Sequence, residues 1–146
     1  MSNYKNPTRA MSFPEAEVQA VIVQYLQLMK IYCLHIPNER KSTAVAMGRL
    51  VAQGLRKGAA DLLIFYPNDW KKRIEIYHQM ALGTPISNRP LVTMGYIEVK
   101  RPKGGVQSDA QKRFERRCNA VGISYDLARS VDEVKVILEK RYNITL

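Results

Sequence analysis

Three charged residues beside apolar, strand-like runs could perform chemistry together. Glu98 and Lys100 stand two apart in the run 95–100 (GYIEVK), and an extended strand projects such side chains from the same face, about 7 Å apart along the chain. Asp61 stands immediately before the apolar run 62–66. Taken singly, each has an ordinary structural explanation. Glu98 and Lys100 could form a solvent-facing polar face or an ion pair, and Asp61 could form a turn.

Taken together, the three residues favour a catalytic site. Two carboxylates at the ends of neighbouring strands offer the oxygen ligands that a hard divalent cation prefers. Such a cation activates water and stabilises the charge that develops on a phosphate, as phosphodiester hydrolysis requires. Lys100 would orient the attacking water or neutralise the transition state. The set therefore predicts a centre that binds a hard divalent cation such as Mg²⁺.

Periodicity and turn residues predict the elements that must position this set. The predicted order is a helix from residue 13, strands over 31–36, 62–66 and 95–100, a helix from 108, a strand over 123–128 and a final helix from 130. The basic, glycine-punctuated segment 39–60 is either partly irregular or contains a short helix over 42–53. This order indicates the α/β class, with a mixed central sheet flanked by helices.

The helices carry their own signals of orientation. The first has an apolar stripe that should face the core, formed by Val18, Val21, Ile22, Tyr25, Leu26 and Met29. Glu15 lies beside that stripe and Glu17 on the opposite face. Capping boxes begin the last two helices, at 108–111 and at 130–133. Their inward faces should be Ala110, Phe114, Cys118 and Val121 in one helix, and Val134, Ile137 and Leu138 in the other.

Residues 67–95 are expected to form an insertion or long loop, with a short helix over 74–80 as an option. Trp70 is interpreted as a packing residue, although the cluster 71–73 (KKR) keeps base stacking open as an alternative. Residues 1–12 are expected to be a flexible N-terminus, and 13–146 a single domain.

Composition narrows the class of protein. The chain has 146 residues, 23 Lys and Arg against 13 Asp and Glu, and a net charge of +10, which favours a polyanionic partner such as nucleic acid. No run reaches the roughly 18 apolar residues of a membrane span, so a cytoplasmic protein is expected. Cys33 and Cys118 lack metal-site spacing and are expected to be buried apolar side chains. His35 and His78 have no partner motif and are not assigned as ligands.

Asp61 followed by Glu98-Val99-Lys100 resembles the D…E-x-K motif of the PD-(D/E)xK nucleases, with Ala60 in place of the Pro. More narrowly, the chain resembles the VRR-NUC family of virus-type replication-repair nucleases between about residues 14 and 138. Five segments carry the resemblance, in order 14–19 (PEAEVQ), 35–38 (HIPN), 54–64 (GLRKGAADLLI), 97–100 (IEVK) and 108–111 (SDAQ).

The resemblance implies a restriction-endonuclease-like fold and Mg²⁺- or Mn²⁺-dependent cleavage of DNA, often of branched DNA, in phage or prophage replication, recombination or repair. It makes Asp61 and Glu98 metal ligands, with the Val99 carbonyl as a further ligand, and Lys100 catalytic. It also implies that Glu15 reaches the metal directly or through water, and that Gln111 supports the site. Otherwise Glu15 is a helix-dipole carboxylate and Gln111 only a capping residue.

Basic residues flank the predicted site and are candidates for phosphate contacts, namely Arg56, Lys57, Arg101, Lys103, Lys112 and Arg113. A symmetric substrate that needs two cuts would favour a homodimer. Two other classes remain. A DNA-binding module without catalysis would have no use for clustered acids facing a polyanion. A basic structural or ribosome-associated protein would explain the charge but not those acids.

Overall fold

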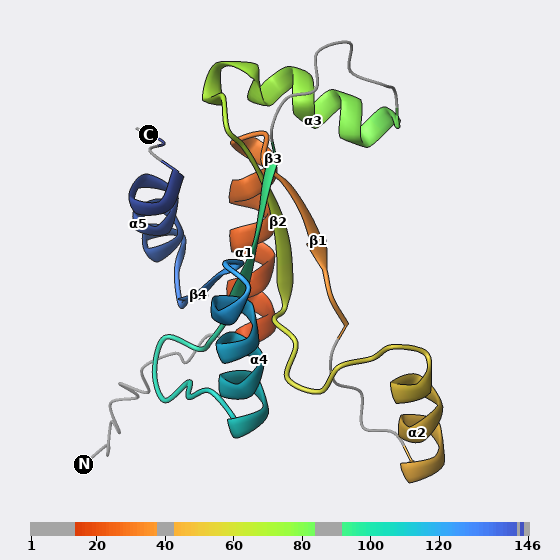
Figure 1. Ribbon diagram of the computed structural model, residues 1–146. Coiled ribbons are helices and arrows are strands. Elements are labelled where there is room, and N and C mark those ends of the chain that lie inside the picture. The colour runs from red at the N-terminus through yellow and green to blue at the C-terminus, as the bar shows by residue number, and fades with distance from the viewer. Residues whose placement is uncertain (1–13, 38–42, 84–91, 143, 145–146) are drawn as a thin grey trace, which may run out of the picture.

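The computed structural model describes residues 14–37, 43–83, 92–142 and 144. Its elements in chain order are α1 (Glu15–Leu28), β1 (Tyr32–His35), α2 (Ala44–Ala52), β2 (Leu62–Pro67), the 3-10 helix η1 (Trp70–Lys72), α3 (Arg73–Leu82), β3 (Val92–Val99), α4 (Asp109–Ala120), β4 (Ser124–Ala128) and α5 (Val131–Tyr142) (Figure 1). No helix among these residues is long and apolar enough to cross a membrane. The predicted flexible segment 1–12 lies outside the described residues.

The described strands form one open, mixed sheet in the order β1-β2-β3-β4. The β1/β2 and β2/β3 pairs are antiparallel, and the β3/β4 pair is parallel. A parallel neighbour requires a crossover, which α4 supplies. The α/β class and the mixed sheet flanked by helices are therefore confirmed.

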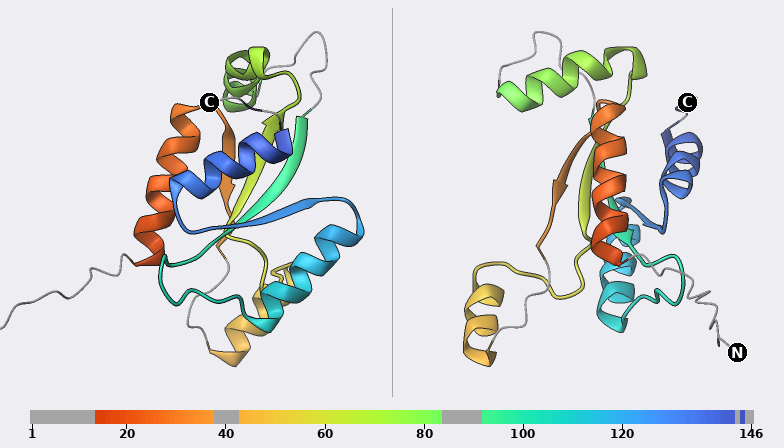
Figure 2. Two further views of the ribbon diagram at one scale, coloured as in Figure 1. Left: turned by 90° about the vertical axis from the view of Figure 1, so that its left-hand side faces the viewer. Right: turned by 180° about the vertical axis from the view of Figure 1, so that it is seen from behind.

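One face of the sheet carries the main core. α1 and α5 pack on this face (Figure 2, left), because each presents an apolar stripe at helical spacing. The fully buried members include Ile22, Leu26, Leu62, Ile64, Tyr66, Ile97, Val99, Val134 and Leu138. Val21 was predicted to belong to the stripe of α1, but its side chain is 52% exposed.

A second, smaller cluster lies on the opposite face beneath α4. Cys118 packs there with Tyr125 and Ala60, and Phe114 and Tyr96 complete it. Ser108 and Gln111 form the predicted capping box at the start of α4. Val121, predicted to face inward, follows the last helical residue and is 71% exposed.

Within the segment predicted as an insertion or long loop, 67–95, the described residues 67–83 and 92–95 are mostly regular structure, and 84–91 lie outside the described residues. β3 begins at Val92 rather than Gly95 and pairs with β2 as far as Pro67↔Val92. Between them, α3 contains the short helix that was an option, and lies at one end of the sheet (Figure 1). Trp70 packs against the main core with the Arg73 guanidinium over its ring, in agreement with the packing interpretation.

The predictions for segment 39–60 and for the two cysteines have different outcomes. α2 realises the short helix of segment 39–60, and Thr43 caps it through a bond from the Ala46 N–H. Cys118 is buried as predicted, whereas Cys33 is only half-buried.

A glycine sets how closely the loop before β2 approaches α4. Gly58 has a φ of +81°, and a Cβ there would lie 2.4 Å from the carbonyl carbon of Ala110. Only a residue without a side chain lets this backbone reach the first turn of α4. Gly54 also has a positive φ, +102°, but a Cβ there would meet nothing within 4 Å.

This pair of glycines separates backbone strain from steric exclusion. We expect Gly54→Ala to lower the free energy of unfolding by about 1 kcal/mol, because of its positive φ. Gly58→Ala should cost about 1–3 kcal/mol more, because the methyl group must displace the backbone of α4. Urea unfolding of both variants measures the difference. Equal losses would show that the close approach at Gly58 is unimportant.

Candidate functional site

The register of the sheet brings three strand ends to one place. His35 pairs with Leu62, and Leu62 pairs with Ile97. Asp61, directly before β2, therefore lies beside the end of β3, which carries Glu98 and is followed directly by Lys100. Its Oδ2 accepts a hydrogen bond of 2.8 Å from the Val99 N–H. The predicted neighbourhood of the two carboxylates is thus present.

Glu98 is fully buried, and its carboxylate has donors on both oxygens. Its Oε1 lies 2.8 Å from the Lys100 Nζ and accepts a hydrogen bond from the Gln111 Nε2. Its Oε2 accepts from the Tyr125 hydroxyl at 3.4 Å. Lys100 itself is only 6% exposed. The pairing on one face of β3 is therefore a buried ion pair, and the alternative of a solvent-facing polar face is wrong.

Gln111 caps α4, as predicted, and also contacts Glu98. Its Oε1 accepts the Ser108 N–H at 2.8 Å and completes the capping box, while its Nε2 binds Glu98. The first turn of α4 is therefore fixed to the end of β3 through one side chain.

Burial dominates the electrostatics of the two strand carboxylates. Desolvation raises the pKa of Glu98 to about 7; Lys100 opposes this shift, and the charges of Asp61 and Glu15 add to it. Desolvation also raises the pKa of Asp61, against the hydrogen bond from Val99. Crowded carboxylates resist ionisation together unless a cation joins them.

Glu15 reaches the same region from the first turn of α1. Its Oε1 lies 4.0 Å from the Lys100 Nζ, and its side chain is 40% exposed. The helix phase thus directs Glu15 toward the site, as predicted. Glu15, Asp61, Lys100 and Gln111 line one cavity of about 620 Å³, which the buried Glu98 adjoins through Lys100 and Gln111.

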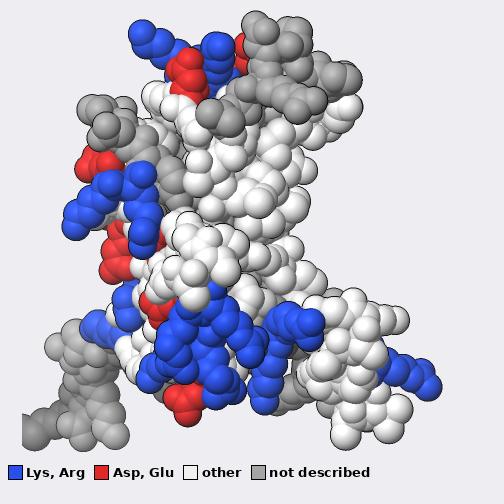
Figure 3. Space-filling view, in the orientation of Figure 1, with Lys and Arg blue, Asp and Glu red and all other residues white. Residues whose placement is uncertain are grey.

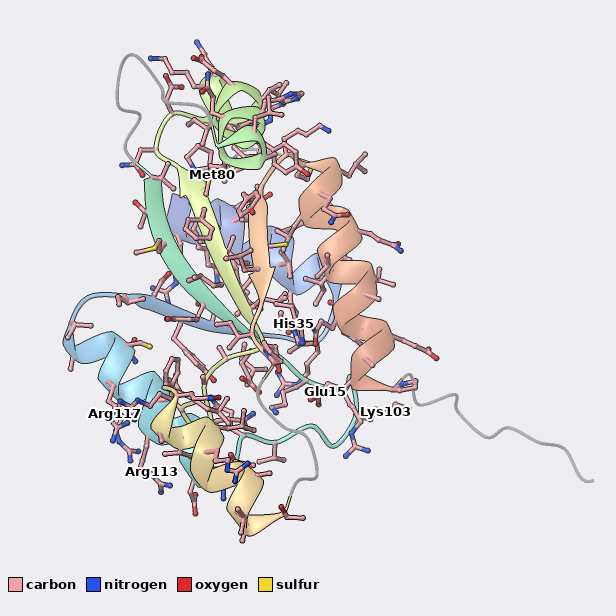
Figure 4. All side chains as sticks on the ribbon, turned by 90° about the vertical axis from the view of Figure 1, so that its right-hand side faces the viewer. Glu15, His35, Met80, Lys103, Arg113 and Arg117 are labelled. Atoms are coloured by element: carbon pink, nitrogen blue, oxygen red, sulfur yellow. The ribbon has the colours of Figure 1, made fainter. Side chains whose placement is uncertain are left out.

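His35 was not assigned from the sequence, yet it lines this cavity. Its Nδ1 lies 3.2 Å from the Asp61 carbonyl and 2.7 Å from the Gln19 side-chain amide. With Nδ1 unprotonated, the Gln19 Nε2 donates to it; with Nδ1 protonated, Nδ1 donates to the Asp61 carbonyl. Figure 4 shows His35 and Glu15 on neighbouring elements at the site. The pairing of β1 with β2 creates this proximity. The sequence signals were the position of His35 at a strand end and its place in the segment 35–38 (HIPN).

The carboxylate oxygens of the site suit a divalent cation, although these carboxylates do not surround one point. No group of three or more His, Cys, Asp or Glu side chains within the described ranges is arranged to hold a metal ion. One reason is that Lys100 and Gln111 engage Glu98. Asp61 and Glu15 nevertheless border one open cavity, and their charges act on Glu98. Oxygen donors of this kind fit Mg²⁺ or Mn²⁺.

All six of the predicted phosphate-contact residues are exposed. Figure 3 shows Lys and Arg side chains gathered over α4 and beside the loop that follows α2. Figure 4 shows Arg113 on one side of the site and Lys103 on the other, near Glu15. Cations therefore flank the acidic cavity on both sides.

Comparison of the chain with protein-family models, with curated proteins and with solved structures found no match.

The raised pKa of Glu98 gives stability a testable pH dependence. A carboxyl whose folded pKa exceeds its ordinary 4.5 binds protons better in the native state, so its stabilisation is complete below about pH 4.5 and is lost as the pH rises through 7. Glu98→Gln removes this dependence. The unfolding free energy of the variant minus that of the wild type should rise by up to about 3 kcal/mol across this range. Denaturant titrations in chelator measure it, and a pH-independent difference would contradict the assignment.

Proposed function

We propose that this protein is a metal-dependent endonuclease that hydrolyses phosphodiester bonds of DNA. The observation that carries the proposal is the meeting of Asp61, Glu98 and Lys100 beside an open cavity flanked by exposed cations. Acids at the centre of a basic surface would repel a polyanion unless a cation joined them to it. Metal-dependent catalysis requires such acids, whereas a basic structural protein would not need them.

Asp61 and Glu98 would hold the cation, with Glu15 and the Val99 carbonyl as further oxygen donors. A divalent cation supplies Lewis acidity toward water and the phosphate oxygens. For Glu98 to take part, Lys100 must release part of its hold on the Oε1 atom. The freed ammonium would then face the cavity, where it can orient water or neutralise charge on the phosphate. Gln111 would keep the Glu98 carboxylate in place through this exchange.

A narrower form of the proposal follows from the sequence motifs. We propose a VRR-NUC nuclease with a restriction-endonuclease-like fold, acting on branched DNA in phage or prophage replication, recombination or repair, within the cytoplasm. The described mixed sheet is compatible with that fold, and the five ordered segments support the family.

A DNA-binding module that does not cut is the rival proposal. Exposed cations on both sides of the cavity suit either protein. The buried Glu98–Lys100 pair favours the enzyme, because burial of charge is costly and a binding surface gains nothing from it.

Substitution of the central residues tests catalysis. Asp61→Ala, Glu98→Ala and Lys100→Ala should each lower cleavage of labelled branched DNA in Mg²⁺ or Mn²⁺ by at least about 100-fold, because the three side chains act as one unit. Glu15→Ala should lose activity, while Glu17→Ala, on the opposite face of α1, should keep it. Linear duplex and EDTA serve as controls. Full activity of Glu98→Ala would refute the assignment.

We also propose a homodimer, because one small domain supplies one candidate active site and a symmetric substrate needs two cuts. Light scattering at micromolar protein, with and without junction DNA, should give twice the mass of 16.7 kDa. A monomeric mass under both conditions would contradict this.

A further inference from the structure

The outer face of α4 carries more positive charge than the predicted contact residues account for. Lys112, Arg113, Arg116 and Arg117 are all exposed. At 100° per residue they occupy an arc of about 140°, and Phe114 and Cys118 lie outside it, toward the second core cluster. The same helix thus packs on one side and presents these four cations on the other, with the exposed Asp109 one turn before them on the same face.

These four cations are joined to the loop before β2. Arg56 and Lys57 are exposed in that loop, and the next residue, Gly58, lies against the backbone of Ala110 and Gln111. Figure 3 shows the positive side chains as a group over α4 that extends toward α2. We call the six residues the α4 track, comprising Arg56, Lys57, Lys112, Arg113, Arg116 and Arg117.

The cations of the α4 track have no carboxylate partner among the described residues. Elsewhere Arg141 binds Asp126 at 2.7 Å and Lys135 binds Asp132 at 3.1 Å. Those pairs use positive charge within the fold. The α4 track instead leaves its charge available for an external polyanion. On α4 its residues begin directly after Gln111, which contacts the site, and continue along the helix away from the site.

We propose that the α4 track binds the phosphate backbone of a duplex DNA arm that leads away from the cleavage site. This inference rests on the proposed function and adds to it the form of DNA held next to the cut. The cations on α4 lie between residues 112 and 117, so they span about 8 Å of the helix axis, which corresponds to about two base pairs.

The packing of the aromatic side chains near α4 indicates whether the α4 track binds duplex or single-stranded DNA. Single-stranded DNA is commonly held by bases that stack on exposed rings. The rings nearest to α4, those of Phe114, Tyr96 and Tyr125, instead pack edge to face or tilted against one another within the second core cluster. The track therefore offers charge without stacking partners, which suits the phosphates of a paired arm.

The salt dependence of binding tests the track without relying on cleavage. Binding of a branched DNA with duplex arms is measured in EDTA at several salt concentrations for the wild type and for Arg116→Gln/Arg117→Gln. The plot of log Kobs against log salt should lose a slope of about 1.8, since each lost phosphate contact contributes about 0.9. Arg116→Lys/Arg117→Lys should retain most of the wild-type slope, which would show that the loss follows from the missing charges and not from substitution at these positions.

The matched control is Lys71→Gln/Lys72→Gln. These two exposed cations lie in η1, at the opposite end of the sheet from α4 (Figure 1), and their loss changes the net charge equally. This variant should keep the wild-type slope. Equal losses in both double variants would overturn the track, because only net charge would then matter.

A single-stranded oligonucleotide provides the second comparison. Arg116→Gln/Arg117→Gln should weaken duplex binding more than single-strand binding, and an equal or larger loss for the single strand would overturn the duplex assignment. Failure of the proposed nuclease function can be distinguished from failure of the α4 track. A wild type that shows the predicted slopes but never cleaves DNA in Mg²⁺ or Mn²⁺ would support the track and refute the nuclease.

Discussion

The burial of the Glu98 carboxylate beside the Lys100 ammonium is the constraint on which the arrangement of this end of the sheet depends. Removal of either charge from water is expensive unless hydrogen bonds replace the lost hydration. Gln111 and Tyr125 provide them, so α4 must begin directly over the end of β3. That position in turn requires Gly58, because a side chain there would collide with the first turn of α4.

Burial of the Glu98–Lys100 pair costs stability, and the proposed function would explain that cost. In a folding domain without another purpose, apolar residues would fill these two positions, at and directly after the end of β3, at lower cost. Here the carboxylate carries a raised pKa because of its burial, with Asp61 and Glu15 close enough to add to the shift. Local violations of packing rules are expected where a protein performs chemistry. The position of this one, beside an open cavity, is consistent with that rule.

Sequence patterns predicted those features that depend on local periodicity. The same-face relation of Glu98 and Lys100 and the capping role of Gln111 are consequences of strand and helix geometry. The proximity of His35 to Asp61 depends on strand register, which no local pattern specifies. The outward position of Val21 had a similar cause, since the width of an apolar stripe depends on which neighbours cover it. The start of β3 was predicted at Gly95 instead of Val92, because residues 92–94 contain no turn signal that would mark an earlier start of the strand.

The distribution of charge connects these arguments. A net charge of +10 could have been spread evenly. Instead, the inner acids are Asp61, which lines the cavity, and the buried Glu98, which adjoins it, while exposed cations stand outside it on α4 and on the turn that carries Lys103. Outer cations attract a polyanion over a distance of about the Debye length, roughly 8 Å at physiological salt. The inner acids repel it at contact. A bound phosphate backbone could approach Asp61 and Glu98 closely only with a cation between them, so the separation of charge itself favours metal-dependent chemistry over simple adhesion to DNA.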